Sequence, residues 1–563
     1  MAELFIELLS ADLPARMQKQ ASEAFAKIML QKLEEFDIPF DEGGFHSTPR
    51  RLIFFVNGLP AKIEDSVEER RGPRTDAPEK AIQGFLRGAG VSLDQCEKRD
   101  TGKGEFYFAQ IVKKGGDTSN VLQRIIPEAI GAMQWPKSMR WGETSVRWAR
   151  PLKNILAVFD GKVVPFNFDL GGEAEPLTAN TKTVGHRFLK PEEIKVTDFD
   201  DYQRKMHGAF VMINRDERKK IIMNEATLIA KGKGLTLIDD NNLVEEIVGL
   251  IEWPVVLNGT FEEEFLKVPQ ECLISTMKKD QKYMPMFDDN GKLANHFVVV
   301  SNMITDDKGK AIVAGNEKVL RARLSDARFF YEQDLKHKLE DHRTGLTQIK
   351  FHDQLGNLEQ RTKRLEELSE TISKSMDDHS GQSKIAAGLC KCDLLSGMVG
   401  EFPELQGIMG RYYALAEKFP SKVAFAIEEH YSPAGPDDAC PTDPVSVQLA
   451  LADKVDVLSG FFAIDQKPTG SKDPFALRRA ALGIIRLILE NKLRLNLKEL
   501  FDKGVSSYDG IIDIAKKDQI VSDLLEFIAD RLKVALKDKG VRHDVIDSVF
   551  SVSFDGDLTS MIA

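Results

Sequence analysis

The chain has 563 residues, 42% of them hydrophobic and 29% charged, which is the composition of a globular protein long enough for several domains. Its formal net charge of −11 does not suggest a nucleic-acid-binding protein, but it does not exclude one, because local basic patches rather than the net charge contact phosphates. No run of about 18 apolar residues is present, the five cysteines are sparse, and the first residues are acidic where a signal peptide is basic, so we expect a cytoplasmic protein without a membrane span.

The first half of the sequence mixes the patterns of strands with those of helices. Strands are predicted at residues 4–9, 51–56 and 106–112, and helices at residues 13–36, 78–87 and 120–133. The dipeptides Asp160-Gly161 and Asn290-Gly291 each lie between two apolar runs and predict β-hairpins. Because strands and helices do not alternate with regular βαβ spacing, the pattern favours an α+β fold over a doubly wound sheet.

From about residue 316 the strand patterns end and amphipathic helices follow one another. They are predicted at residues 319–333, 360–375, 383–399, 422–430, 445–464, 474–492, 517–538 and 543–550. The change of pattern predicts a domain boundary between Asp307 and Asn316. The expected fold is therefore multidomain, with an α+β N-terminal half followed by an all-α half. Its expected regions are 1–170 and 171–312, which can form one unit, then 313–500 and 501–563.

Two basic stretches in the first half are candidates for contact with RNA. The first combines "HSTPRRL" with "ERRGPR", and the second, residues 135–153, holds five basic residues against one acid together with three of the four tryptophans. Cations bind phosphates and aromatic rings stack on bases. The candidates are Arg50, Arg51, Arg70, Arg71, Lys137, Arg140, Trp141, Arg147 and Arg150. The alternative, that the tryptophans fill a core and the arginines are merely solvated, stays open.

A third basic stretch, "GSKDPFALRR", opens a predicted helix. Asp473 is expected as the N-cap and Pro474 at the first helical position. Lys472, Arg478 and Arg479 would then surround a helix N-terminus whose free N–H groups favour an anion. The arginines can equally pair with acids on a neighbouring helix, and the sequence does not decide between the two.

The sequence contains no self-contained active site. It lacks a phosphate-binding glycine loop, a dinucleotide fingerprint, a kinase signature and zinc-spaced cysteines. One pattern is similar to metal-dependent phosphohydrolases of the HD type, with Cys392 and Asp393 in one helix and Asp453 in another. Since His352 is the one nearby histidine and lies in a turn-like stretch, we expect no metal site here and regard these positions as degenerate.

Long stretches, in order from about residue 47 to 490, match one protein family. They include "STPRRL", "KSMRWG", "GHRF", "EWPVVLNGTFEEEFLKVPQECLISTMKKDQKY", "SNM", "GNEKVLRARLSDARFF", "KCDLLSGMVGEFPELQGIMGRYYA", "LADKVDVLSGFF" and "GSKDPFALRRAALG". On these stretches the chain resembles the β subunit of the bacterial heterotetrameric (α2β2) glycyl-tRNA synthetase.

The resemblance implies an aminoacyl-tRNA synthetase, a glycine–tRNA ligase that charges tRNA(Gly). It implies that ATP and Mg²⁺ are used on the α subunit, which carries the catalytic core, and that this chain binds tRNA, holds no cofactor and is itself not catalytic. It also implies that the N-terminal half is similar to an α+β domain of the phenylalanyl-tRNA synthetase large subunit and that the helical region is a degenerate HD-like domain. Residues 501–563 would begin an anticodon-binding region, most of which this sequence lacks.

The leading hypothesis is thus a cytoplasmic subunit that positions tRNA(Gly) for the α subunit. Two alternatives stay open. An HD-type phosphohydrolase would bind a divalent metal at Asp393 and Asp453. A pure assembly scaffold would hold the α subunit in shape, with RNA binding secondary.

Overall fold

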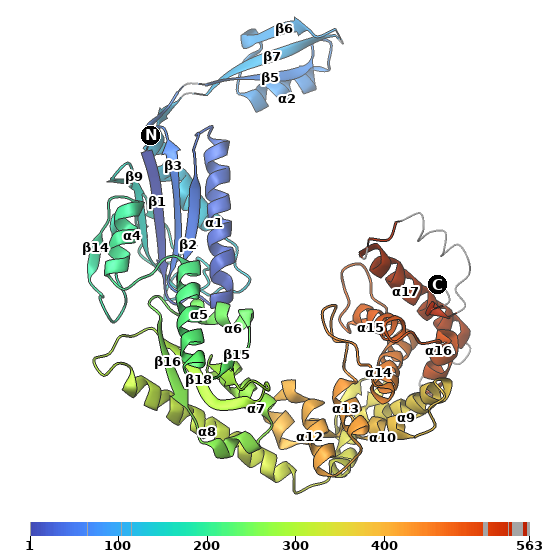
Figure 1. Ribbon diagram of the computed structural model, residues 1–563. Helices are drawn as coiled ribbons and strands as arrows, with labels where there is room; N and C mark the ends of the chain where they lie inside the picture. The colour runs from blue at the N-terminus through green and yellow to red at the C-terminus, as the bar shows by residue number, and fades with distance from the viewer. Residues whose placement is uncertain are drawn as a thin grey trace. The chain divides into compact units, whose positions relative to one another are not determined.

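The computed structural model describes residues 2–64, 66–102, 104–113, 115–510, 516–538, 540–542 and 556–559. The chain divides into two compact units, one comprising residues 1–261 and 281–318 and the other residues 262–280 and 319–563. The chain enters the second unit after residue 261, returns after residue 280, and passes to the second unit again within helix α8 (Lys310–Asp334). The predicted combination of an α+β first half and a helical second half is confirmed (Figure 1).

A five-stranded antiparallel sheet forms the centre of the first unit. Its strands, in spatial order, are β10 (Lys162–Val163), β9 (Leu152–Phe159), β1 (Ala2–Ser10), β3 (Arg51–Leu59) and β2 (Gly43–Ser47). Helices α1 (Ala15–Glu35) and α3 (Thr118–Ala132) pack on one face, and α4 (Phe199–Gly208) packs on the other. Because helices cover both faces, β1 is apolar along most of its length instead of alternating.

A small lobe, residues 66–113, is inserted between β3 and α3. Its sheet has the order β5 (Ser66–Arg74), β7 (Glu105–Lys113), β6 (Cys96–Asp100), and helix α2 (Glu79–Ala89) packs against β5. The strands β4 (Lys62–Ile63) and β8 (Gly116–Asp117) pair where the chain enters and leaves the lobe.

The first unit contains a second sheet, of four strands. Their spatial order is β15 (Thr236–Leu237), β17 (Met284–Phe287), β18 (Leu293–Ser301) and β16 (Val255–Thr260). Helices α5 (Arg215–Lys231) and α6 (Asn241–Val248) pack on it. Two short ribbons pair β11 (Asn167–Phe168) with β12 (Leu177–Thr178) and β13 (Lys182–Val184) with β14 (Glu193–Lys195).

Both predicted hairpins are confirmed. Asp160-Gly161 joins β9 to β10, and Asn290-Gly291 joins β17 to β18. Gly161 and Gly291 both have φ of 73°, the left-handed conformation that glycine adopts without a steric cost.

The second unit is built of helices, apart from a two-stranded ribbon of β19 (Lys350–His352) and β20 (Gly356–Asn357). The helices are α7 (Gln270–Ser275), α9 (Leu358–Ser375), α10 (Gln382–Leu389), α11 (Gly397–Glu401), α12 (Ile408–Ala416), α13 (Ser421–Glu429), α14 (Pro444–Ala463), α15 (Leu477–Glu490), α16 (Leu497–Ser506) and α17 (Lys517–Asp538). Helix α14 is enclosed by the others and is buried along nearly its whole length. None of the helices in the described part of the chain combines the length and apolar character needed to cross a membrane.

The prediction of one continuous helix over residues 383–399 is wrong. Helix α10 ends at Leu389, and after a 3-10 turn α11 begins at Gly397. Between the two helices the Asp393 carboxylate accepts from the backbone N–H groups of Gly407 and Gly410, and Ser396 then acts as the N-cap of α11, where its hydroxyl accepts from the backbone N–H of Val399 at 3.2 Å. The predicted helix at residues 543–550 lies outside the described residues.

Candidate nucleic-acid interface

Three strand ends meet at one edge of the five-stranded sheet. The register pairs Leu9 near the end of β1 with Arg51 at the start of β3, and Ser10 with Leu152 at the start of β9. The "HSTPRRL" stretch runs into β3, and the tryptophan-rich stretch runs into β9. The antiparallel topology therefore brings parts of two basic stretches, distant in sequence, to the same edge.

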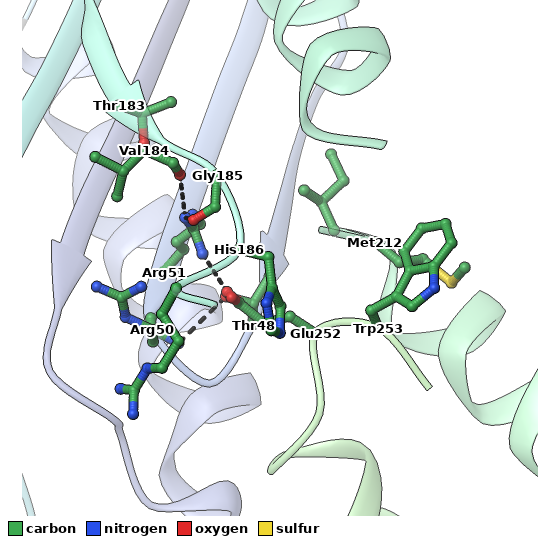
Figure 2. A network of polar contacts seen from close by, with 12 residues as sticks. Thr48, Arg50, Arg51, Thr183, Val184, Gly185, His186, Met212, Glu252 and Trp253 are labelled. Atoms are coloured by element: carbon green, nitrogen blue, oxygen red, sulfur yellow. Dashed lines mark hydrogen bonds and ion pairs between the residues drawn. The ribbon is translucent and has the colours of Figure 1, made fainter. Parts of the chain in front are cut away.

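A buried polar network lies at this edge (Figure 2). Arg51 is fully buried; its Nε donates to Glu7 at 3.1 Å, and its Nη1 pairs with Glu252. Its Nη2 donates to the Val184 carbonyl at 2.5 Å, and Thr48 gives Glu252 a second hydrogen bond at 2.7 Å. Since protein groups enclose its guanidinium, Arg51 is not placed to touch an RNA, in contrast to the prediction.

In this network the Arg51 guanidinium lies between two carboxylate side chains, Glu7 and Glu252. Burial opposes the ionisation of Glu252, but the attraction of Arg51 and the hydrogen bond from Thr48 outweigh burial and lower the pKa of this carboxyl. Burial, reinforced by the charge of Glu7, raises the pKa of Tyr202, so its hydroxyl stays protonated and donates to Glu7. Removing Arg51 would leave both carboxylates buried without its compensating charge.

Glu7 and Glu252 are members of this network that were not among the predicted site residues. One signal for Glu7 was present, because it interrupts the apolar run of residues 4–9, and a buried charge in a strand needs a partner. Glu252 lies in the "EWPVV" stretch, one of those that carry the family resemblance, yet its partner Arg51 is 201 residues away. No local pattern reveals such a pair.

Arg50, beside Arg51, makes no ion pair with a described residue. It is 9% exposed, and its buried Nε has no hydrogen-bond partner. Burial, followed by repulsion from Arg51, lowers the pKa of Arg50. In Figure 2 its guanidinium points away from Glu252. Nearby at the surface, Arg187 pairs with Asp12 at 2.6 Å.

The tryptophans of the second stretch belong to the core. Trp148 is 1% exposed and donates from Nε1 to Ser10 at 3.2 Å. Trp135 and Trp141 are half-buried and pack against the same core. The core alternative is therefore confirmed for Trp148, and Trp141 offers only part of its ring to a base.

The basic residues of the second stretch lie at the surface. Lys137, Arg140, Arg147 and Arg150 are all exposed. Arg147 stabilises the loop before β9 to which it belongs: its Nε donates to the Ser138 hydroxyl at 3.0 Å and its Nη2 to the Ser138 carbonyl at 3.1 Å. Lys137 and Arg150 line one cavity of about 710 Å³.

Arg70 and Arg71 lie on β5 of the lobe rather than at the sheet edge. Arg71 covers the ring of Phe106 at 3.8 Å, and Arg70 donates to the Gly88 carbonyl at 3.2 Å. Both remain exposed, so they form a separate group of cations.

The third stretch lies in the second unit and starts its helix later than predicted. Helix α15 begins at Leu477, and Ala476 before it is left-handed with φ of 54°. The Asp473 carboxylate accepts from the backbone N–H of Leu477 at 2.9 Å and of Arg478 at 3.0 Å. The predicted free anion site at this helix end is therefore wrong, because a carboxylate of the chain already occupies it.

The arginines of this stretch bind backbone carbonyls instead of acids. Arg478 donates to Gly470 at 2.7 Å and Arg479 to Ala434 at 3.3 Å. Lys472 is exposed. The two arginines border a cavity of about 820 Å³ whose floor includes apolar side chains of α15 and α17. Their positive charges remain without an acidic partner in the described part of the second unit.

The degenerate HD positions do not converge. The Asp393 carboxylate accepts from the backbone N–H groups of Gly407 at 2.5 Å and Gly410 at 3.0 Å, which fixes the turn before α12. Burial raises the pKa of Asp393 to about 6. Burial likewise raises the pKa of the Cys392 thiol, so this group is not a thiolate ligand at neutral pH.

Asp453 is compensated by cations of the protein itself. Its Oδ1 lies 2.9 Å from Arg361 and 3.1 Å from Lys391 Nζ. Although burial opposes ionisation, these two cations lower the pKa of Asp453. Lys391 Nζ also lies 2.6 Å from Nε2 of His430, whose Nδ1 lies 2.6 Å from the Ile427 carbonyl. This geometry assigns the proton to Nδ1, which leaves Nε2 as an acceptor.

A carboxylate and an imidazole that could have bound a metal thus surround an ammonium group. In the described ranges no three His, Cys, Asp or Glu side chains are grouped so that they could hold a metal ion. The donor set does not fit the metal-dependent phosphohydrolase alternative, because Arg361 and Lys391 would repel a divalent cation.

These features define a multidomain protein with cationic surface sites on a framework of buried ion pairs, and not an HD-type hydrolase. The chain matches the family described as "Glycyl-tRNA synthetase beta subunit" over residues 4–551, and it belongs to this family. It is 50% identical to the glycine–tRNA ligase beta subunit of Rhodospirillum centenum, 46% to that of a Ruegeria species and 45% to that of Paracoccus denitrificans. Each match covers the whole chain and 81% of the relative. The family resemblance seen in the sequence is thereby confirmed.

Proposed function

We propose that this chain is the tRNA-binding β subunit of a cytoplasmic α2β2 glycine–tRNA ligase. It holds tRNA(Gly) while the α subunit, using ATP and Mg²⁺, attaches glycine; the chain itself binds no cofactor. The observation that carries this proposal is the convergence of Arg50, Lys137 and Arg150 from two basic stretches at one sheet edge, without acidic partners in the described part of the first unit. Phosphate contacts of this kind fix the position of a nucleic acid.

Positioning is a sufficient contribution to the reaction. A tRNA held with its 3′ end at the partner's active site reacts as if it were part of the same molecule, which removes much of the entropic barrier of a bimolecular step. This division of labour agrees with Arg51 and Asp453, two buried charged groups that are compensated by other side chains of the same chain.

The finer domain assignments are part of the same proposal. The N-terminal regions 1–170 and 171–312 would be similar to an α+β domain of the phenylalanyl-tRNA synthetase large subunit, and 313–500 would be a degenerate HD-like domain. The position of Lys391 beside His430 and Asp453 supports the second assignment, because a cation stands among groups that could ligate a metal. Residues 501–563 would be the helical start of an anticodon-binding region.

A salt-dependent titration tests the function. Labelled tRNA(Gly) is titrated with the purified chain at 50 to 250 mM salt, and charging is assayed with and without the α subunit. We expect binding that weakens steeply with salt and charging only in the presence of α. If the chain binds no tRNA at the lowest salt while α still requires it for charging, the scaffold alternative is correct. If the chain alone attaches glycine, the division of labour is wrong.

A further inference from the structure

The cavity of about 710 Å³ opens beside the first turns of α1. Its wall includes the start of α1, the loop before β9, and residues of α5 and α6. Its basic lining residues are Arg16, Lys19, Lys137, Arg150 and Arg215. Two acids, Glu245 and Glu246 of α6, also line it.

The two acids are already neutralised by the protein. Glu245 binds Arg215 at 2.8 Å and Lys219 at 2.8 Å. Glu246 binds Lys282 at 3.1 Å. The wall of the cavity formed by α6 and by Arg215 of α5 therefore carries little uncompensated charge.

The opposite wall keeps its positive charge. Arg16 and Lys137 are exposed and make no ion pair with any described residue, and Arg150 Nη1 donates only to the adjacent Ala149 carbonyl at 2.8 Å. The N-cap of α1 is Pro14, which makes no side-chain cap, and the first turn holds no acid. The helix dipole thus adds to the charge of three cations in a concave site. Three unpaired cations facing one cavity favour the binding of an anion from outside.

We propose that this cavity binds a backbone phosphate of the RNA, with Arg150 as the principal donor and Lys137 and Arg16 as flanking charges. The proposal rests on the proposed tRNA-binding function and adds the place where the RNA backbone is held. A guanidinium offers paired N–H donors that match two phosphate oxygens, while an ammonium acts as a point charge. Arg150 should therefore contribute orientation, and Lys137 and Arg16 mainly attraction.

The test compares Arg150→Ala and Lys137→Ala with a matched control, Lys162→Ala. Lys162 is equally exposed and belongs to the same sheet, but it pairs with Phe159 at the opposite end of β9. The full chain is titrated with tRNA(Gly) across a salt series. We expect the magnitude of the slope of log K against log salt to fall by about 0.9 in each cavity variant and affinity to fall about tenfold in Arg150→Ala. Lys162→Ala should behave as wild type.

Inorganic phosphate distinguishes an RNA backbone from a small anion. If phosphate at constant ionic strength binds the cavity of wild type and not of Arg150→Ala, while both bind tRNA equally, the occupant is a small phosphate and the proposal is overturned. Competition between phosphate and tRNA supports it. Arg150→Lys, which keeps the charge, should restore the salt slope but only part of the affinity.

The outcome also separates this inference from the function on which it rests. If wild type binds tRNA and both cavity variants keep its slope and affinity, the cavity assignment fails and the tRNA-binding function stands. If wild type binds no tRNA, both fail. Thermal unfolding of each variant checks the fold, and Lys137→Ala, which removes an exposed side chain, remains informative if Arg150→Ala unfolds.

Discussion

Lys391 and His430 meet inside the helical unit, with Nζ 2.6 Å from Nε2, although one is 2% and the other 0% exposed. Asp453 at 3.1 Å completes the surroundings of the ammonium, and the ring of Tyr431 lies 4.0 Å from it. Attraction to Asp453 outweighs burial and raises the pKa of Lys391, so this lysine is charged in the folded protein. The ammonium group of Lys391 therefore occupies the space between His430 and Asp453 that a metal ion would need in order to bind both side chains.

Replacing Lys391 by methionine should destabilise the chain strongly. The change removes one of the cations that compensate buried Asp453 and leaves His430 Nε2 without a donor, so we expect a loss of about 3 kcal/mol in the free energy of unfolding. Urea unfolding followed by circular dichroism measures it. The control is Lys363→Met on the exposed face of α9, where a surface pair with Glu359 at 3.1 Å should be worth less than about 1 kcal/mol. Equal losses in the two variants would contradict the role of Lys391.

Because of Lys454, the free energy of unfolding should increase as the pH rises above about 8. Burial lowers the pKa of its ammonium to about 8, whereas an unfolded lysine titrates near about 10.4. Between these values the unfolded chain retains a proton that the folded chain has released, so wild type should gain stability relative to Lys454→Met by up to about 1.4 kcal/mol per pH unit. Below pH 8 both states are protonated, and the difference between the proteins should stay constant. Denaturant titrations at pH 7, 8.5 and 9.5 measure this; parallel stability curves would show that Lys454 is not desolvated.

Glu252→Gln should weaken the first unit. The substitution keeps the shape but replaces one of the two carboxylates bound to Arg51 by a neutral amide, and we expect a cost of about 2 kcal/mol because a charge-assisted hydrogen bond is weakened while Glu7 remains paired. Glu246→Gln, on the exposed side of α6, is the matched control and should cost less than about 1 kcal/mol. Thermal unfolding monitored by tryptophan fluorescence reports the difference, because all four tryptophans lie in this unit. A cost in Glu252→Gln no larger than in the control would mean that the network contributes little.

The double variant Arg478→Ala/Arg479→Ala tests the third basic stretch. Both arginines donate to carbonyls and pair with no described acid, so removing them should lower tRNA affinity without altering glycine-dependent adenylate formation by the α subunit. Filter binding and pyrophosphate exchange measure the two quantities. Unchanged affinity together with a lower melting temperature would show that these arginines only hold the turn before α15.

Local signals were sufficient for most elements of the fold. The hairpins at Asp160-Gly161 and Asn290-Gly291 follow from two-residue turns, and α1 follows from its own periodicity. The break after α10 could not be predicted, because the partners of Asp393 are backbone groups of residues 407 and 410 that only tertiary packing brings near. Helix propensity gives way to such contacts.

The candidate site, like the fold, combines features that the local sequence predicts with features that only the tertiary structure determines. That Lys137 and Arg150 are exposed cations was predictable from their polar surroundings, but that they share a cavity with Arg16 depends on the register of β1 and β9. Arg51 was misassigned because sequence gives the type of a side chain and not its burial. Its neighbour Arg50 lies in the bend just before β3 and makes no ion pair with a described residue, a difference that the shared residue type does not reveal.

The pairing of Lys62 with Asp117 has a consequence for how this polypeptide can be altered. Because those two positions are neighbours in a ladder, the segment between them leaves and rejoins the body at almost the same point. Such a segment has the topology of an insertion, and a short turn could replace it without lengthening or straining β3 or α3. A variant of this chain that lacks residues 64–115 should still form the five-stranded sheet. The inserted segment should therefore be removable by protein engineering without loss of the rest of the first unit.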